Sequence, residues 1–435
     1  MRIFKVSQYK KNILNNFIAN IFNMVLAFVI SILIARKLGP TGRGYLAFFM
    51  LIADLVASYG HLGIINATNY FQTRMGFKKE KIYNINLTCN ILICIIMTVV
   101  FSVLYTNGIA FKNYNIPLFS AFIAYTVLIL LRSFLNTIYI GDERIKSMNM
   151  FTIVTATISS VIVLLNITHL TLFMYVCIKV IEVGINVLLL LFNSKYKYKP
   201  ELDFKIIKQE IKYGINPLLA SLSIYLNYKI DKFLIEYLKG LTELGLYSNA
   251  VTLSELVLVI PQAIANPITA KLYNLSLESE ERKETILKTL RYGFTACVIL
   301  TVIGMCCIPL IPVVYGTKYI PSKLMTFILF LSIPFVSIGK ITTPYFYSSG
   351  NVKIITKFSV ISLIINTVLN FILIPRMGGN GAAIASTISY TIYGVQYIRY
   401  FKKEFNVKTK ELLFINKSEI LVLIQQIKNK IRRFT

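Results

Sequence analysis

Apolar runs of about 20 residues recur along the whole length of this chain, and they constrain its fold more than any other feature. A helix of about 20 apolar residues spans the roughly 30 Å of hydrocarbon in a bilayer. The composition agrees, since 56% of the residues are hydrophobic and 15% are charged, whereas a soluble domain carries about 25% charged residues. We therefore predict an all-α polytopic membrane protein.

The hydropathy pattern predicts about 12 spans arranged as two halves. The expected spans cover residues 13–35, 44–70, 84–106, 117–140, 150–167, 171–192, 213–238, 244–270, 291–315, 324–347, 354–375 and 380–400. A polar, basic segment at 195–212, KYKYKPELDFKIIKQEIK, separates the sixth span from the seventh. We expect an N-terminal lobe over residues 1–200, a C-terminal lobe over 201–400 and a basic amphipathic cytoplasmic tail over 401–435.

The stretch LGPTGRGYLAFFMLIADLVASYGHLG, residues 38–63, joins a Gly/Pro turn to a long apolar helix that contains a carboxylate, Asp54. Its outline recurs after a shift of 201 residues, which takes Gly39 to Gly240 and Asp54 to Glu255. A carboxylate in an apolar helix is costly, so its recurrence at one register indicates a duplication. The same shift aligns Leu33 with Leu234, Ile34 with Ile235, Gly44 with Gly245, Leu55 with Leu256 and Val56 with Val257. Repeats of this kind are common in secondary transporters.

The strongly basic charge balance, a net charge of +27, sets the expected topology. On these boundaries the loops on the side of the N-terminus carry roughly 30 Lys and Arg residues, and the opposite loops carry about 8. We therefore place both termini in the cytoplasm. Six spans per half return the chain to its starting side, so the halves are parallel repeats. Basic loops that meet anionic lipid headgroups account for the charge, and we expect no nucleic-acid partner.

Motifs for enzymatic chemistry are absent from the sequence. The expected extracytoplasmic loops are about 10 residues or shorter. The sequence contains no Walker A, HExxH, GxSxG or DxD pattern. The six cysteines lie inside apolar runs without metal-ligand spacing, so we expect no disulfide and no metal. These observations argue against an enzyme. In the tail, apolar residues at helical spacing alternate with Lys and Arg, which predicts a helix on the cytoplasmic leaflet.

Three segments together resemble the polysaccharide transporter family of the MATE/MOP flippase superfamily, and specifically the O-antigen (Wzx-type) lipid-linked oligosaccharide flippases. They are ARKLGPTGRGYLAFF at 35–49, LNYKIDKFLIEYLKGLTELGLYSNAVTLSELVLVIPQAIANPITAKL at 226–272, and NFILIPRMGGNGAAIASTISY at 370–390. The resemblance implies two six-helix lobes around a central cavity that work by alternating access. It implies a bacterial cytoplasmic (inner) membrane location and an undecaprenyl-diphosphate-linked O-antigen or capsule unit as substrate. It is also compatible with contacts to other polysaccharide-assembly proteins.

Acidic residues inside the spans are candidates for ion coupling. Asp54 and Glu255 each lie ten residues beyond a glycine of the repeat, which places both about 15 Å deep. Either carboxylate could exchange H⁺ or bind Na⁺ as the lobes move, pair with a cation in the cavity, or serve packing as a structural acid. Asp231 in the seventh span is a third candidate. Apart from a coupling ion, we expect no cofactor.

Basic residues inside the spans are candidates for binding the diphosphate. Cations in spans usually face protein or water, because facing lipid costs several kcal/mol. Four of the candidates have an alternative role: Lys179 could pair with Glu182 three residues later, and Arg132, Lys229 and Lys232 could reach the membrane interface. The candidates are Arg132, Lys179, Lys229, Lys232 and Lys340.

Two other functions compete with that of a flippase. A drug/cation antiporter of the same superfamily would favour an acidic, aromatic cavity, whereas the single charges here are mostly basic. A membrane-embedded glycosyl- or phosphotransferase would need a carboxylate or metal constellation at one water interface, which we do not find. His61 lies two turns beyond Asp54 in the expected second span, which places both side chains on much the same helix face. We expect His61 to be a hydrogen-bonded packing residue, with a proton relay as the alternative.

Overall fold

The computed structural model describes residues 2–73, 75–415 and 419, and the regular secondary structure of this part of the chain is helical. The chain divides into two compact units, Met1–Leu222 and Ser223–Thr435. The division between the units falls within the helix Phe204–Lys239, and the boundary expected at residue 200 lies just before this helix.

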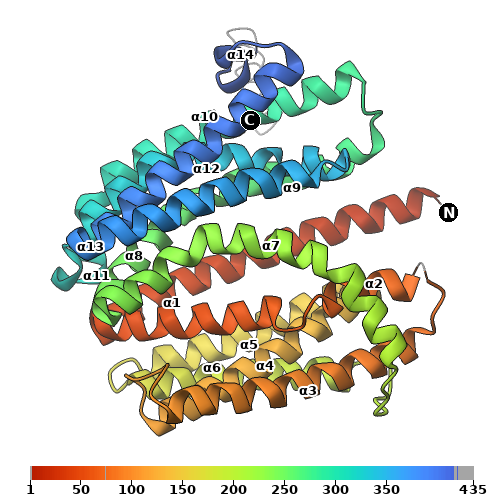
Figure 1. The fold of residues 1–435 in the computed structure, drawn as a ribbon, viewed down its shortest axis with the longest axis vertical. Coiled ribbons are helices and arrows are strands. Elements are labelled where there is room, and N and C mark those ends of the chain that lie inside the picture. Colours follow the sequence, from red (N-terminus) through yellow and green to blue (C-terminus); the bar gives the residue numbers. More distant parts are fainter. Residues whose placement is uncertain (1, 74, 416–418, 420–435) are drawn as a thin grey trace, which may run out of the picture. The chain divides into compact units, whose positions relative to one another are not determined.

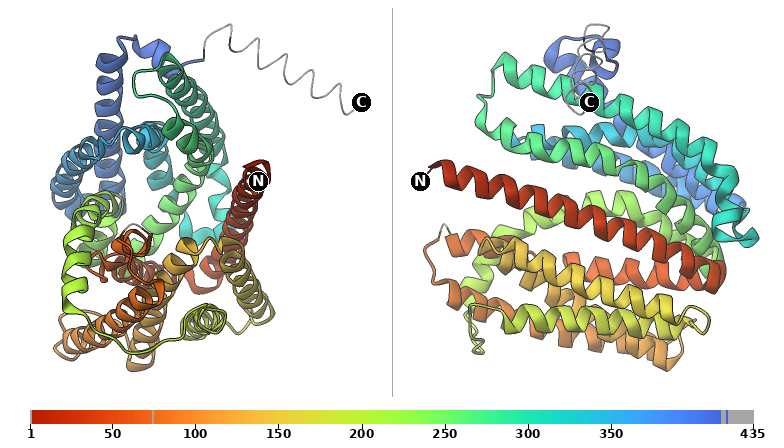
Figure 2. Two further views of the ribbon diagram at one scale, coloured as in Figure 1. Left: turned by 90° about the vertical axis from the view of Figure 1, so that its right-hand side faces the viewer. Right: turned by 180° about the vertical axis from the view of Figure 1, so that it is seen from behind.

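Unit 1 is a bundle whose core is rich in aromatic side chains. It contains α1 (Arg2–Tyr59), α2 (Ile64–Thr73), α3 (Lys79–Thr106), α4 (Ile116–Gly141), α5 (Ile145–Leu165), α6 (Leu172–Phe192) and the start of α7 (Phe204–Lys239). α5 and α6 lie side by side along the unit (Figures 1 and 2). The rings of Phe49, Phe122 and Tyr125 pack together in the core, with centroids 5.0–5.4 Å apart where they contact Phe49.

Unit 2 contains the rest of α7 and the helices that follow. These are α8 (Leu241–Val257), α9 (Val259–Asn274), α10 (Glu280–Cys307), η1 (Ile308–Leu310), α11 (Ile311–Tyr315), η2 (Thr317–Tyr319), α12 (Ser322–Ser348), α13 (Val352–Phe405) and α14 (Thr409–Leu413). α12 packs along α13, and the two helical halves of α13 meet at Gly378, which has a non-helical φ of 56°.

The two Gly turns that the predicted repeat aligns have similar backbone conformations. Gly39, inside α1, has φ 68° and ψ −176°, and Gly240, between α7 and α8, has φ 83° and ψ −178°. This region of backbone space is essentially restricted to glycine. The two halves of α1 run in opposite directions from their junction at Gly39 (Figure 1). The shift of 201 residues therefore relates two turns of the same conformation.

Eight stretches of the described chain are long and apolar enough to cross a membrane, from Val25–Gln72 to Val352–Phe405. The first and the last of them each contain a Gly turn. The expected span at 44–70 is interrupted, because α1 ends at Tyr59 and α2 begins at Ile64.

The start of the basic tail is held against unit 2. Leu412 and Leu413 of α14 are buried in a cluster with residues of α10. Arg291 of α10 donates to the Glu411 carbonyl oxygen at 2.8 Å and pairs with Glu419 at 2.5 Å. Apart from Glu419, the predicted tail helix beyond residue 415 lies outside the described residues.

Candidate functional site

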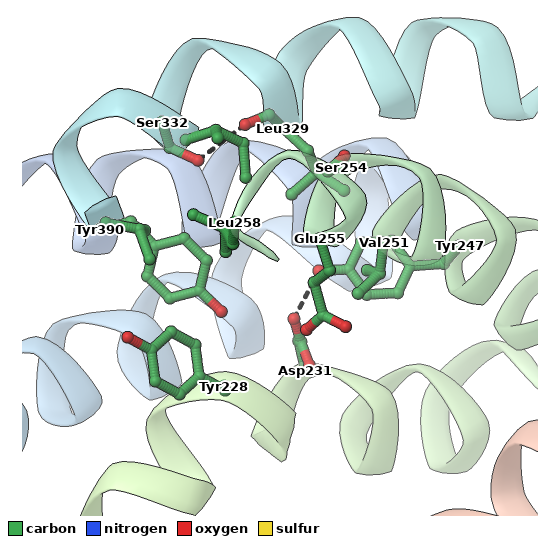
Figure 3. A pocket seen from close by; sticks show the side chains of 12 residues that line it. Tyr228, Asp231, Tyr247, Val251, Ser254, Glu255, Leu258, Leu329, Ser332 and Tyr390 are labelled. Atoms are coloured by element: carbon green, nitrogen blue, oxygen red, sulfur yellow. Dashed lines mark hydrogen bonds between the residues drawn. The ribbon is translucent and has the colours of Figure 1, made fainter. Parts of the chain in front are cut away.

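A small pocket in unit 2 lies among α7, α8, α12 and α13. Its polar lining comes from two carboxylates, three tyrosines and two serines: Asp231, Glu255, Tyr228, Tyr247, Tyr390, Ser254 and Ser332. Figure 3 shows the two carboxylates on one side and the rings of Tyr228 and Tyr390 on the other. The cavity volume is about 20 Å³, which has room for about one water molecule. The pocket therefore suits a small ion or a water molecule and is too small for a sugar ring.

Asp231 is the most deeply buried charged group of this pocket, with 2% of its surface exposed. Its carboxylate accepts hydrogen bonds from the Tyr247 hydroxyl, from Ser386 Oγ at 3.1 Å and from the Lys232 backbone N–H at 2.7 Å. α7 supplies the acid, α8 the tyrosine and α13 the serine. A buried carboxylate is tolerated when several donors satisfy it, so three helices together fix its position.

A chain of amides and hydroxyls extends from Asp231 along α13. Asn366 Nδ2 donates to Ser386 Oγ at 3.3 Å and to Ser389 Oγ at 3.0 Å, and Asn370 Nδ2 donates to Asn366 Oδ1 at 2.8 Å. Asn370 Oδ1 is buried and has no hydrogen-bond partner in the described part of the chain. Carboxylate, amide and hydroxyl oxygens are the ligands that hard cations prefer, so the chemistry of this donor set fits a small hard cation.

Three lysines gather around Glu255 beside the pocket. Lys229 Nζ lies 3.3 Å from Glu255 Oε1, and both side chains are partly exposed, by 26% and 43%. Lys340 Nζ lies 5.3 Å from the centroid of the Tyr228 ring. Lys340 and Lys232 are both within electrostatic range of Glu255. The structure thus brings together the predicted site residues of unit 2. The three lysines of this group outnumber its two carboxylates, Asp231 and Glu255.

The candidates in unit 1 form a second charged network. Lys179 Nζ pairs with Glu182 at 2.6 Å, as the i, i+3 spacing predicts, and Ser159 Oγ donates to the same carboxylate at 2.5 Å. The charges of Arg132 and Asp54 both act on the buried Tyr125 hydroxyl. Asp54 is exposed. The alternative predicted for Lys179, an ion pair with Glu182, is therefore confirmed.

His61 occupies a different position from the one expected. α1 ends at Tyr59, so His61 lies in the turn before α2 and does not continue the helix face of Asp54. The prediction of a shared helix face was wrong, because the turn at residues 60–63 interrupts the apolar run. His61 is buried, and its Nδ1 accepts a hydrogen bond from the Gly63 N–H at 3.1 Å. The expected role as a hydrogen-bonded packing residue is confirmed.

Reasoning from the sequence missed Asn366, Asn370 and Ser386. The signal was present in part, because Asn366 and Asn370 are polar residues one turn apart inside an apolar span. Their relation to Asp231 was not visible, because Ser386 lies 155 residues from Asp231 in the chain.

This chain is similar in sequence to a protein family and to two curated proteins. A family profile described as "Polysaccharide biosynthesis protein" matches residues 33–324. The capsular polysaccharide biosynthesis protein CapF of Staphylococcus aureus is 26% identical over 41% of this chain and 46% of its own length. An uncharacterized membrane protein of Methanocaldococcus jannaschii is 26% identical over 57% of this chain and 48% of its own. The chain thus spans about half the length of these curated relatives.

Solved structures share the fold across most of the chain. The lipid II flippase MurJ in an inward closed conformation matches with a TM-score of 0.71 and 14% identity, over 97% of this chain and 93% of that one. An inward-facing multidrug resistance MATE transporter of the MOP superfamily matches with a TM-score of 0.70 and 13% identity, over 88% and 94%. The chain therefore shares the fold of these two membrane proteins.

Proposed function

Because this chain belongs to the polysaccharide biosynthesis protein family, we propose that it is a flippase for a lipid-linked saccharide precursor. Its substrate is an undecaprenyl-diphosphate-linked oligosaccharide, an O-antigen or capsule repeat unit, which it moves from the cytoplasmic to the outer leaflet. The capsular relative favours a capsule unit, and the fold shared with a lipid II flippase is consistent with a lipid-linked cargo.

The surplus of lysines around Glu255 is the observation that carries this proposal. A diphosphate loses its hydration when it enters a low-dielectric region, and this loss is costly unless cations replace the water. Lys229, Lys232 and Lys340 can supply point charges, and Arg132 of unit 1 can offer a two-pronged contact. A cargo with a positive charge would be repelled by the same residues.

The proposed architecture has about twelve spans, in two lobes of six helices that rock around a central cavity. The eight candidate stretches of the described chain support this number. Those of α1 and α13 each contain a Gly turn, so each counts as two spans, and α7 and the α8–α9 pair supply two more. We place both termini in the cytoplasm, since the Lys and Arg bias of the loops favours that side.

We further propose that transport is coupled to H⁺ or Na⁺. Asp231 is the main binding group, because its carboxylate is buried among oxygen atoms beside a cavity the size of one water molecule. Asp54 and Glu255 are accessible acids at corresponding positions of the repeat, so they can exchange charge with the cavity as the lobes move.

Substitution of the cavity cations tests the flippase proposal. We expect Arg132→Ala and Lys340→Ala to abolish surface polysaccharide in a strain that lacks the gene, while the amount of protein in the membrane stays unchanged. Lys353→Ala, which removes an exposed lysine in the first turn of α13, is the matched control and should complement fully. Full complementation by both test variants would refute the cationic site.

The MATE-like fold gives a second candidate, a drug/cation antiporter. The two carboxylates and three tyrosines of the unit 2 pocket favour it, whereas the surplus of lysines around Glu255 opposes it. Efflux of cationic dyes by cells that express the protein, with no effect on surface polysaccharide, would select the antiporter.

A further inference from the structure

One buried acid, Glu210, takes no part in the site described above. It lies in the first turns of α7, before the expected span at 213–238, and none of its surface is exposed. The buried residues Ile206, Glu210, Gly214 and Leu218 follow each other at intervals of four and form one stripe of the helix. Ile206 belongs to an apolar cluster with residues of α2 and α3. The stripe therefore places a carboxyl group in the interface between α7 and these two helices.

The contacts of Glu210 are few and neutral. Asn86 Nδ2 of α3 donates to Glu210 Oε1 and to Thr68 Oγ1 of α2, both at 3.0 Å. The Thr68 hydroxyl in turn donates to the Ile64 carbonyl oxygen at 2.9 Å. In the described part of the chain, Glu210 Oε2 and Asn86 Oδ1 are buried without a hydrogen-bond partner. A single amide donor therefore serves the whole carboxyl group.

The ion pairs of the described residues do not include Glu210. Of the charged side chains of α3, Lys81 pairs with Asp203 at 3.0 Å and with Glu201 at 3.9 Å, Lys79 pairs with Asp142 at 3.3 Å, and Glu80 is exposed. α3 also presents the Cys89 thiol to Glu210. The titratable side chain of α2, Tyr70, stacks on Tyr213 with ring centroids 4.3 Å apart. On α7 itself, Lys208 and Lys212 are exposed to the outside of the interface.

A carboxylate without a counter-charge is costly to bury, whereas a neutral carboxylic acid is not. From this geometry we propose that Glu210 is a proton-binding site that controls the docking of the first turns of α7 on α2 and α3. With the proton bound, the neutral acid lies in the interface. Loss of the proton leaves a buried negative charge with one amide donor, and this segment of α7 then separates from α2 and α3 to hydrate the charge.

The backbone around Gly214 shows how close this docking is. The Gly214 and Gly63 backbones approach so closely that neither position has room for a Cβ atom. Separation of α7 must break this contact as well. Because the same helix carries Asp231 and Lys229 further along, the proton on Glu210 acts on the helix that supplies the proposed transport site.

The pH range over which docking changes follows from the direction in which the pKa of Glu210 is shifted. Burial raises the pKa of Glu210 from 4.5 to about 7, with the Asn86 hydrogen bond opposing it. The docked state therefore binds the proton more tightly than the separated state. The contribution of the proton to docking is complete below pH 4.5 and is lost as the pH rises to about 7.

Hydrogen–deuterium exchange of the full-length protein in detergent or nanodiscs tests the proposal. We expect the amides of residues 204–214 to exchange about tenfold or more faster at pH 8.5 than at pH 5.5, after correction for the intrinsic pH dependence of exchange. Glu210→Gln should remove this excess, because the amide cannot ionise. Glu80→Gln, which changes an exposed acid of α3, should behave as the wild type does.

A second variant keeps the test decisive if Glu210→Gln folds poorly. Asn86→Leu removes the hydrogen bond that favours the carboxylate, so it should move the midpoint of the pH dependence upward. A merely structural role would lower protection at every pH without moving that midpoint. Equal pH dependence in wild type and Glu210→Gln, or an unmoved midpoint in Asn86→Leu, would overturn the proposal. Neither result bears on the flippase proposal, which surface polysaccharide reports separately.

Discussion

Replacement of Asp231 by asparagine separates a cation-binding acid from a structural one. Asparagine has nearly the same shape, and its carbonyl oxygen can still accept from the Tyr247 hydroxyl and from Ser386. The variant therefore keeps most of the packing and loses the negative charge. A bound cation at 100 times its Kd stabilises the folded state by about 2.7 kcal/mol. For a unit the size of Ser223–Thr435, this corresponds to about 5–10 °C in the melting temperature.

Thermal unfolding in detergent measures this effect directly. Sodium should be titrated against choline at constant ionic strength, at pH 5.5 and at pH 8.5, so that Na⁺ and H⁺ are varied independently. We expect one of the two cations to raise the melting temperature of the wild type and to have no such effect on Asp231→Asn. Glu236→Gln, an acid of the same helix outside the cluster, is the control and should respond as the wild type does. An identical response of wild type and Asp231→Asn to both cations would refute the assignment.

Two further predictions concern positions that the fold makes costly to change. Gly39→Ala and Gly240→Ala should each lower the free energy of unfolding by about 1–3 kcal/mol, because both backbones lie in a region restricted to glycine while an added Cβ would meet no neighbour. In thermal unfolding assays Gly184→Ala, where the Cβ would make an ordinary 3.7 Å contact inside α6, should instead be neutral or stabilising. Similar losses in all three variants would contradict the argument from backbone conformation. Arg282→Ala should cost about 3 kcal/mol or more, because this buried guanidinium donates to the Leu272 and Tyr345 carbonyl oxygens and to Ser348 Oγ. Arg282→Lys should fall between wild type and Arg282→Ala in melting temperature, and a wild-type value for Arg282→Ala would show that these contacts contribute nothing.

Local features of the sequence were sufficient for the class of protein and for part of the site. Apolar runs and short Gly turns can be identified in the sequence because hydropathy and backbone conformation depend on neighbouring residues. The pairing of Lys179 with Glu182 was predictable for the same reason, because residues three apart meet on one helix face. The interruption at residues 60–63 was missed, although Gly60 and Gly63 mark it in the sequence, because the hydropathy of residues 44–70 reads as one span.

The sequence by itself determined a helical membrane protein with a repeated Gly turn, because bilayer thickness and glycine's backbone freedom act on short stretches of chain. Only the tertiary structure decided the partners of the charged residues. Glu255 pairs with Lys229 of the preceding helix, Asp231 accepts from Ser386 far along the chain, and Glu210 faces a neutral amide of α3. These contacts depend on how each helix is rotated and packed against its neighbours, and hydropathy does not encode that rotation.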